Sequence, residues 1–430
     1  MNPFRKFDIY YIVTLLFLFL SAASNFLTAS DIGWFAVMFF MLIVAISKKS
    51  ITERNLKTIA IFSVVYLVFV GVRDVLINNL EMEFLVSDVL FLFKYIFLSF
   101  IFCIILRDKA IIYIVKVAKP LIIISIFLYF FQLIGLGDYI YKYSSALNLP
   151  NNLGTDGYTN CLFFTYCKYH EFRNSGFFWE PGAFACFLVI ILLLNLLLNK
   201  FKFDRDNIII VIALITTTST TGYLALLLIC FLVYRYRVPK INMWVVILIP
   251  LTLIIIINTP NLGDKISGTF ESDMKDSRPH QLRILERYSR HQKSQTALNR
   301  FSSMIVIYNT FGADLILGVS NKYNVILNKT DDVNISNGVF DFMAKFGLVG
   351  FIFLVYKFSK FCKVYLARGE LLMYCIIIFL IICTGEPVVF LPNILIFLFM
   401  TLEQSTSFKL RTNPDDDIPH LAMNERDNKD

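Results

Sequence analysis

One short segment carries groups that could bind an anion and accept a proton. It reads Arg173-Asn174-Ser175-Gly176-Phe177-Phe178-Trp179-Glu180-Pro181-Gly182-Ala183-Phe184. Pro181 suits the first turn of a helix, where its missing N–H group costs no hydrogen bond. A helix that begins at Pro181 presents free N–H groups and a positive dipole end. Since Arg173 lies just upstream, a guanidinium and a helix end together could bind an anion.

Glu180 is the proton-accepting group of this segment. It lies at the edge of an apolar run, where a carboxylate is costly unless it has a partner or a purpose. Two interpretations stay open. Glu180 is either a helix N-cap paired with Arg173, or a general base or ligand for sugar hydroxyls.

A second concentration of charge lies between residues 278 and 300. This stretch contains one acid, Glu286, and six basic residues. The basic residues are Arg278, Arg283, Arg287, Arg290, Lys293 and Arg300. Spacings of three and four residues fit the solvated face of a helix. The alternative is an anion site that faces a membrane surface, and the density of positive charge favours it.

The elements that must position these groups are membrane helices. Of all residues 57% are hydrophobic and only 17% are charged, which excludes a soluble protein of this length. Each membrane span needs about 20 mostly apolar residues. The sequence predicts an all-α polytopic protein with an integral membrane domain at 1–403 and a disordered cytoplasmic tail at 404–430.

About twelve transmembrane helices are expected, with the first retained rather than cleaved as a signal peptide. The apolar runs are 9–27, 32–47, 58–76, 85–106, 110–135, 177–198, 207–218, 221–234, 241–257, 337–356, 370–385 and 388–402. The run at 207–234 could also be one long helix, because Thr216 to Thr221 interrupt it.

Charge placement gives an orientation, because cytoplasmic loops are rich in Lys and Arg. Placing every basic connector inside makes the hydroxyl run the outer apex of a hairpin. Two large external loops, at about 137–176 and 258–336, then lie on the outer, non-cytoplasmic side of the membrane. Of the charged residues inside spans, Asp88 and Lys94 lie deepest and are expected to pair between helices. Cys161 and Cys167 lie in the first loop, where an oxidising compartment could join them.

Four motifs in the second half resemble those of Wzy-type O-antigen and capsule repeat-unit polymerases. Residues 173–182 resemble the family's R-x-x-G-x-F-x-E-P-G segment, and Thr216 to Gly222 resembles its hydroxyl-rich hairpin apex. Asn299-Arg300-Phe301 with Ile316-Leu317-Gly318-Val319 resembles its second-loop segment. Asn337 through Gly350 resembles its entry into the next span. The resemblance covers roughly residues 170–400 together with the predicted span layout.

This resemblance implies a polyprenyl-pyrophosphate carrying a short oligosaccharide as substrate, and a glycosyltransferase that needs no cofactor or metal. An acceptor sugar hydroxyl would displace the lipid pyrophosphate. Arg173, Arg290 and Arg300 are the candidate pyrophosphate ligands. The candidate bases are Glu180, His291 and Glu386; a lone loop histidine is more often simply solvated. A chain-length regulator protein is a possible partner, and nucleic acid is not.

Two alternatives remain. The related O-antigen ligases commonly have a catalytic histidine just before the asparagine of the last motif, where this chain has Ser336. A lipid-linked oligosaccharide flippase or secondary transporter would also carry charged residues within its spans. The sequence lacks the paired broken helices and matching halves of many transporters, so a polymerase is favoured.

Overall fold

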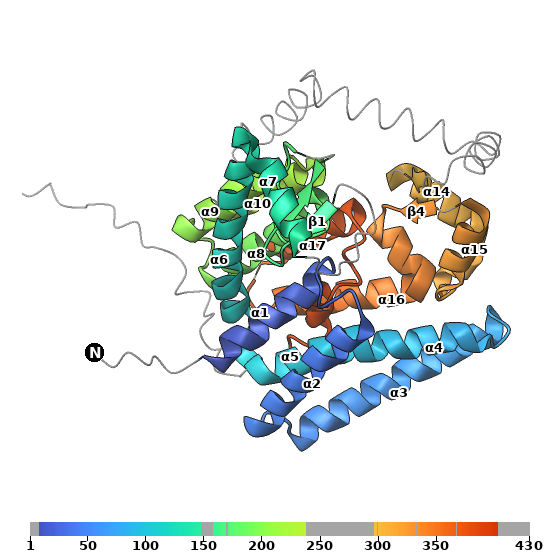
Figure 1. Ribbon diagram of the computed structural model, residues 1–430. Helices are drawn as coiled ribbons and strands as arrows, with labels where there is room; N and C mark the ends of the chain where they lie inside the picture. The colour runs from blue at the N-terminus through green and yellow to red at the C-terminus, as the bar shows by residue number, and fades with distance from the viewer. Residues whose placement is uncertain are drawn as a thin grey trace, which may run out of the picture.

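The computed structural model describes residues 8–147, 158–168, 171–237, 296–298, 300–331, 333–366 and 368–402. The described chain is mostly helical, with two small two-stranded sheets (Figure 1). The helices of the first half are α1 (Ile9–Ala22), α2 (Asp31–Ser47), α3 (Glu53–Leu76), α4 (Met82–Phe91), η1 (Leu92–Phe97), α5 (Leu98–Leu106), η2 (Arg107–Lys109), α6 (Ala110–Phe131), η3 (Gln132–Leu136) and α7 (Gly137–Ala146). Those that follow are α8 (Pro181–Leu198), α9 (Arg205–Thr216), α10 (Thr220–Arg237), α14 (Arg300–Phe311), η5 (Gly312–Ile316), α15 (Lys322–Asp331), α16 (Gly338–Cys362), α17 (Gly369–Gly385), α18 (Pro392–Leu395) and η6 (Ile396–Leu398).

Four helical stretches are long and apolar enough to cross a membrane: Glu53–Leu76, Met82–Ala146, Pro181–Leu198 and Gly338–Cys362. Ile9–Ala22, Asp31–Ser47 and Gly369–Gly385 are shorter apolar helices. Many large apolar side chains of α2 and α3 point outward, as do those on one side of α16. Such a surface is expected of helices that face lipid, and the chain is a membrane protein.

Two of the expected spans can be compared closely with the structure. The run 207–234 forms two helices, α9 and α10, which confirms the hairpin with its turn at Thr217–Ser219. The expectation of a single membrane helix over 388–402 is wrong. This segment makes only the short α18 and η6, and it is almost wholly buried against α1, α5 and α16. Irregular backbone is tolerated at membrane depth where protein surrounds it. The run 241–257 and the tail 404–430 lie outside the described residues.

Different groups lie at the two ends of α9, α10 and α17. At one end, Lys119 pairs with Asp206, and Arg235 Nη2 lies 2.7 Å from Glu370 Oε2. At the other end, the hairpin apex meets the end of α17, because a Cβ on Gly385 would overlap Thr221 Cγ2. The basic connectors and the hydroxyl apex therefore lie at opposite ends of the same helices, as the charge pattern predicts.

A short parallel sheet aligns two segments of the second loop. β3 (Thr296–Leu298) pairs with β4 (Val333–Ile335), and Leu298 lies opposite Ile335. Arg300 follows the pair by two residues on one strand, and Asn337 follows by two on the other. The Asn337 side chain donates from Nδ2 to the Arg300 carbonyl at 3.2 Å, and its Oδ1 caps α16 by accepting from two N–H groups. The starts of α14 and α16 are thus held together.

Helix α16 is broken at Gly347, which has φ 74° and ψ 171°. The break leaves the carbonyls of residues 344 and 345 free for other donors. Val319 N–H donates to Ala344 O at 2.6 Å, and Ser320 N–H donates to Lys345 O at 3.2 Å. Side chains at Gly318 or Gly347 would overlap the opposing backbone. Glycine at both positions therefore allows the second loop to pack directly on α16.

A buried charge cluster attaches α3 and α4 to the break in α16 and to the second-loop segment packed on it. Arg73 is fully buried; it pairs with Asp88 and lies 2.9 Å from Asp74 Oδ1. Its Nη1 donates to Lys345 O at 3.0 Å, and Ser320 Oγ donates to Asp88 Oδ2 at 2.7 Å. Removing one partner from such a cluster would leave a buried charge uncompensated, which costs about 3 to 5 kcal/mol. The expected interhelical pairing of Asp88 is confirmed, and Lys94 likewise pairs with Asp31 of α2.

Candidate functional site

The side chain of Glu386 is the centre of the candidate site. The residue directly follows α17, and the carboxyl group is almost wholly buried. A Cβ on Gly182 would overlap Glu386 Oε1, and a Cβ on Gly338 would overlap the Glu386 carbonyl. Glu386 therefore packs against the first turns of both α8 and α16. Glycine at these two positions makes the close approach possible, and two positive helix ends lie beside the residue.

Arg300 forms an ion pair with this carboxyl group. Its Nη2 lies 3.0 Å from Glu386 Oε1, and the guanidinium side chain is 38% exposed while the glutamate side chain is 10% exposed. One face of Arg300 is thus held by a buried carboxylate while the other reaches the surface. A guanidinium has five N–H donors, so donors remain for a second anion.

The hairpin apex holds the Arg173 segment in place. Asn174 N–H donates to Thr216 O at 3.0 Å, and its side-chain Nδ2 donates to Thr216 Oγ1 at 3.0 Å. Arg173 Nε donates to the Thr217 carbonyl at 3.2 Å. The side of the segment away from the apex is fixed as well, because Thr165 N–H of the β1–β2 hairpin (Tyr158–Asn160 with Thr165–Cys167) donates to Gly176 O at 2.6 Å.

Glu180 occupies the N-cap position of α8 but does not cap it. Its side chain accepts no hydrogen bond from the first turn. Glu180 Oε1 instead accepts from Trp179 Nε1 at 2.9 Å, and the described residues contain no Glu180–Arg173 salt bridge. The interpretation of Glu180 as a cap paired with Arg173 is therefore wrong, since its neighbour Trp179 fixes the carboxylate outside the helix end. The expected start of α8 at Pro181 is confirmed.

The charged groups of the site interact electrostatically; they are Arg173, Glu180, Arg300 and Glu386. Burial raises the pKa of Glu386 well above its usual range, and the negative charge and hydrogen bond of Glu180 raise it further, while Arg300 opposes the shift. Burial lowers the pKa of Arg173, and the charges of Glu180 and Glu386 oppose that change. Glu386 is consequently a stronger base than an ordinary glutamate, with Glu180 and two guanidinium groups close enough to act on it.

The structure brings together four of the six residues singled out in the sequence: Arg173, Glu180, Arg300 and Glu386. Arg290 and His291 lie outside the described residues. Sequence reasoning missed the roles of Trp179, Gly182 and Gly338. The signal for the two glycines is their position, because each lies in the first turn of a helix that enters the membrane region.

The cysteines of the first loop are not joined. Cys167 is buried and lies opposite Tyr158 across the β1–β2 hairpin, while Cys161 lies in the turn and both are free. A disulfide between them is therefore not part of this fold. The hairpin is held instead by its own backbone pairs and by Asn160 Nδ2, which donates to Thr165 Oγ1 at 2.7 Å.

Comparison with known proteins gives one family. Residues 207–355 match a protein-family model described as O-antigen ligase. This segment begins in α9 and ends within α16, so it includes the hairpin apex, Arg300 and Asn337 but neither Arg173 nor Glu386. No curated protein and no solved structure matches the chain.

The raised pKa of Glu386 predicts a pH-dependent stability difference between the wild type and Glu386→Gln. Below about pH 4.3, the ordinary glutamate pKa, the residue is protonated in both folded and unfolded chains. As the pH rises, the unfolded chain loses this proton first, so the wild type loses stability until the pH passes the folded pKa. The glutamine variant, which keeps shape and hydrogen bonding, should therefore have the higher thermal midpoint in detergent at pH 8 and the same midpoint near pH 4.

Glu83→Gln is the matched control, because Glu83 is exposed and forms no salt bridge within the described residues. Its midpoint should stay close to that of the wild type at both pH values, since an exposed charge contributes about 0 to 1 kcal/mol. A Glu386→Gln difference that is equally constant would contradict a buried glutamate with a raised pKa.

Proposed function

We propose that this protein is a glycosyltransferase that joins polyprenyl-pyrophosphate-linked oligosaccharide repeat units into an O-antigen or capsule polysaccharide. The observation that carries the proposal is the convergence of two arginines and two glutamates at one end of the helices. Similarity to the O-antigen ligase family over residues 207–355 supports the same substrate class, because this family acts on lipid-linked sugars.

The proposed reaction needs two things from the protein. The bond between the first donor sugar and the lipid pyrophosphate breaks as the acceptor hydroxyl oxygen bonds to the same sugar carbon. The hydroxyl proton must go to a base, and the pyrophosphate must leave with its negative charge stabilised. The pyrophosphate linkage itself supplies the driving force, so the reaction consumes no nucleotide.

Glu386 is the proposed base. A carboxylate with a raised pKa accepts a proton more readily near neutral pH than an ordinary glutamate. Glu180, fixed by Trp179, raises that pKa and can accept hydrogen bonds from the acceptor sugar. This proposal assigns a role that the sequence leaves open among Glu180, His291 and Glu386.

Arg300 and Arg173 are the proposed pyrophosphate ligands, with Arg290 of the second loop as a third. Arg300 has donors beyond the one that meets Glu386. Arg173 lies within electrostatic reach of Arg300, Glu180 and Glu386. When the pyrophosphate leaves, the developing charge would therefore appear beside two guanidinium groups and away from bulk water.

The site is proposed to face the periplasm from a bacterial inner membrane. It lies at the end of α9, α10 and α17 opposite the basic connectors at Lys202, Arg235 and Arg237. Basic connectors are typical of the cytoplasmic side. Lipid-linked repeat units and an acceptor glycan would then meet in the compartment where the surface polysaccharide is assembled.

Ligation of a finished glycan to lipid A is the second candidate, because the matching family is described as O-antigen ligase. The residue before Asn337 bears on the choice between polymerase and ligase. It is Ser336, whose N–H donates to Ser303 Oγ at 3.2 Å, and a serine cannot replace the histidine base that the resemblance associates with ligases. This difference favours polymerisation.

The surface-glycan gel pattern of a deletion strain tests the proposal. A polymerase predicts a single-repeat band without a ladder, restored by the wild-type gene on a plasmid. Complete loss of lipid-A-attached glycan would identify a ligase instead. Accumulation of inward-facing lipid-linked units would identify a flippase and exclude both transferases.

Arg173 and Arg300 variants test the site itself in the complemented strain. Lysine keeps the charge but loses the planar fork that holds two phosphate oxygens. Losing a contact that strengthens as the pyrophosphate leaves should cost roughly 2 to 4 kcal/mol, or about thirty- to a thousandfold in rate. The ladder should shorten or vanish with Lys and vanish with Ala. Abundance in the membrane should stay at the wild-type level for the Arg173 variants and for Arg300→Lys, which keeps a cation beside Glu386.

Arg205 provides the matched control, because it is an exposed arginine at the opposite end of α9. An exposed charge contributes about 0 to 1 kcal/mol, so Arg205→Lys and Arg205→Ala should keep the wild-type ladder. Wild-type ladders from Arg173→Ala and Arg300→Ala at normal abundance would remove the anion site.

A further inference from the structure

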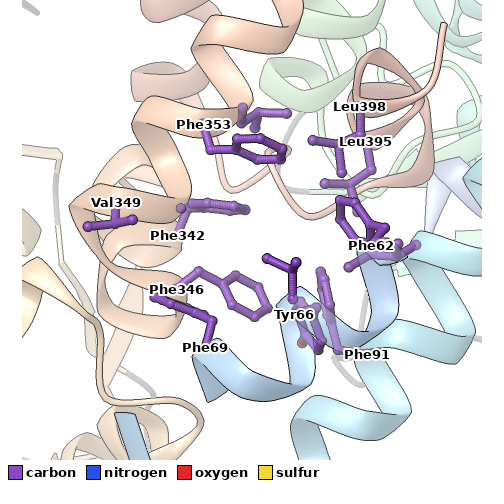
Figure 2. Close-up of a pocket in the computed structure, with 14 residues that line it drawn as sticks. Phe62, Tyr66, Phe69, Phe91, Phe342, Phe346, Val349, Phe353, Leu395 and Leu398 are labelled. Atoms are coloured by element: carbon purple, nitrogen blue, oxygen red, sulfur yellow. The ribbon is translucent and has the colours of Figure 1, made fainter. Parts of the chain in front are cut away.

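An apolar groove of about 250 Å³ lies between α3, the α4–η1 segment, α16 and the α18–η6 segment. Figure 2 shows the rings of Phe342, Phe346 and Phe353 on α16 facing Phe62 and Tyr66 on α3. The lining is almost entirely carbon, and seven of its fourteen residues are aromatic. A cavity of about 150 Å³ with such a lining already binds benzene in another protein. The groove is therefore large enough for part of an apolar chain.

The groove opens sideways, where lipid would lie. Val65 lines it and is 63% exposed, and Phe353 lines it and is 41% exposed. Leu354 and Phe91, on the inner side, are buried. Lining residues on α16 extend from Phe342 to Leu354, on both sides of the break at Gly347. The shape of the groove thus suits one extended chain that lies along a membrane helix.

The groove adjoins the candidate site at Phe342. Phe342 is five residues beyond Asn337, whose side chain holds the Arg300 backbone. Its ring lies 5.3 Å from that of Phe390, which is four residues beyond Glu386. A chain in the groove would therefore end within a few residues of Arg300 and Glu386.

Positive charge marks the same end. Lys345 Nζ lies 4.8 Å from the ring centre of Phe91 and 5.7 Å from that of Phe346, both of which line the groove. Lys345 forms no salt bridge within the part of the chain that the structure describes. Asp88 and Asp341 interact with its ammonium group electrostatically at longer range. A cation at the site end of an apolar groove complements a ligand with one apolar chain and an anionic head.

We propose that this groove binds the polyprenyl chain of the lipid-linked donor and directs its pyrophosphate toward Arg300. The inference rests on the proposed function, because that function supplies a substrate with one long chain and an anionic head. The planar, methyl-branched units of a prenyl chain also suit a wall of aromatic rings. A phospholipid, with two chains and an unspecific head, is the competing occupant.

Photolabelling of the purified full-length protein in nanodiscs tests the groove. The probe is a polyprenyl pyrophosphate without sugar that carries a diazirine in its chain. Labelled peptides should come from residues 62–69 and 342–354, and unlabelled polyprenyl pyrophosphate should compete while phosphatidylglycerol should not. Equal competition by phosphatidylglycerol, or labelling confined to other helices, would overturn the proposal.

Two neighbouring valines provide matched variants. Val65 lines the groove, whereas Val64 does not, and their exposed fractions are 63% and 61%. Val65→Trp should reduce labelling at least fivefold and shorten the glycan ladder, while Val64→Trp should change neither. Unchanged labelling in Val65→Trp would reject the groove.

The two proposals fail in different ways. If the polymerase proposal is wrong, the deletion strain will not show a single-repeat band without a ladder, whereas labelling of the groove is read independently of any glycan pattern. If the groove proposal alone is wrong, the deletion strain will lose the ladder and the probe will label elsewhere.

Discussion

Burial of the Glu386 carboxyl group beside Arg300 is the constraint on which the arrangement of the second half depends. A carboxylate in an apolar surrounding needs a cation and hydrogen bonds close by. Three helix ends supply that surrounding, and Gly182, Gly338 and Gly385 let them approach. The same contact places Arg300 at the mouth of the site, so the group that stabilises the buried carboxylate is also the group available to an anionic substrate.

The first half of the described chain serves this arrangement as a scaffold. Arg73 and Asp88 hold α3 and α4 against the second-loop segment at Ser320 and against the break in α16. The break at Gly347 gives up helical hydrogen bonds, and the loop replaces them. Because α3 and α4 are fixed there, the apolar groove beside α16 keeps its aromatic walls. One set of buried polar contacts thus positions both the second loop and the groove.

The sequence predicted the parts of the site that depend on local rules. Proline at the first turn fixed the start of α8, and the hydroxyl run marked the turn between α9 and α10. It could not predict the burial of Glu386, since Glu386-Pro387 is a short signal whose partners lie far away in the chain. Nor could hydropathy separate residues 388–402 from a membrane helix, because a buried irregular segment is as apolar as a span. The role of Trp179 likewise depends on a rotamer that no spacing rule specifies.

The pH dependence of glycan transfer by the purified protein tests the central claim most directly. If Glu386 is the base, kcat/KM falls as it becomes protonated, and the acidic limb lies well above the ordinary glutamate pKa of about 4.3. Glu180→Gln removes a charge that raises the pKa of Glu386, so residual activity in this variant should show the limb at lower pH. An acidic limb in the ordinary glutamate range, or one that Glu180→Gln leaves in place, would contradict the account.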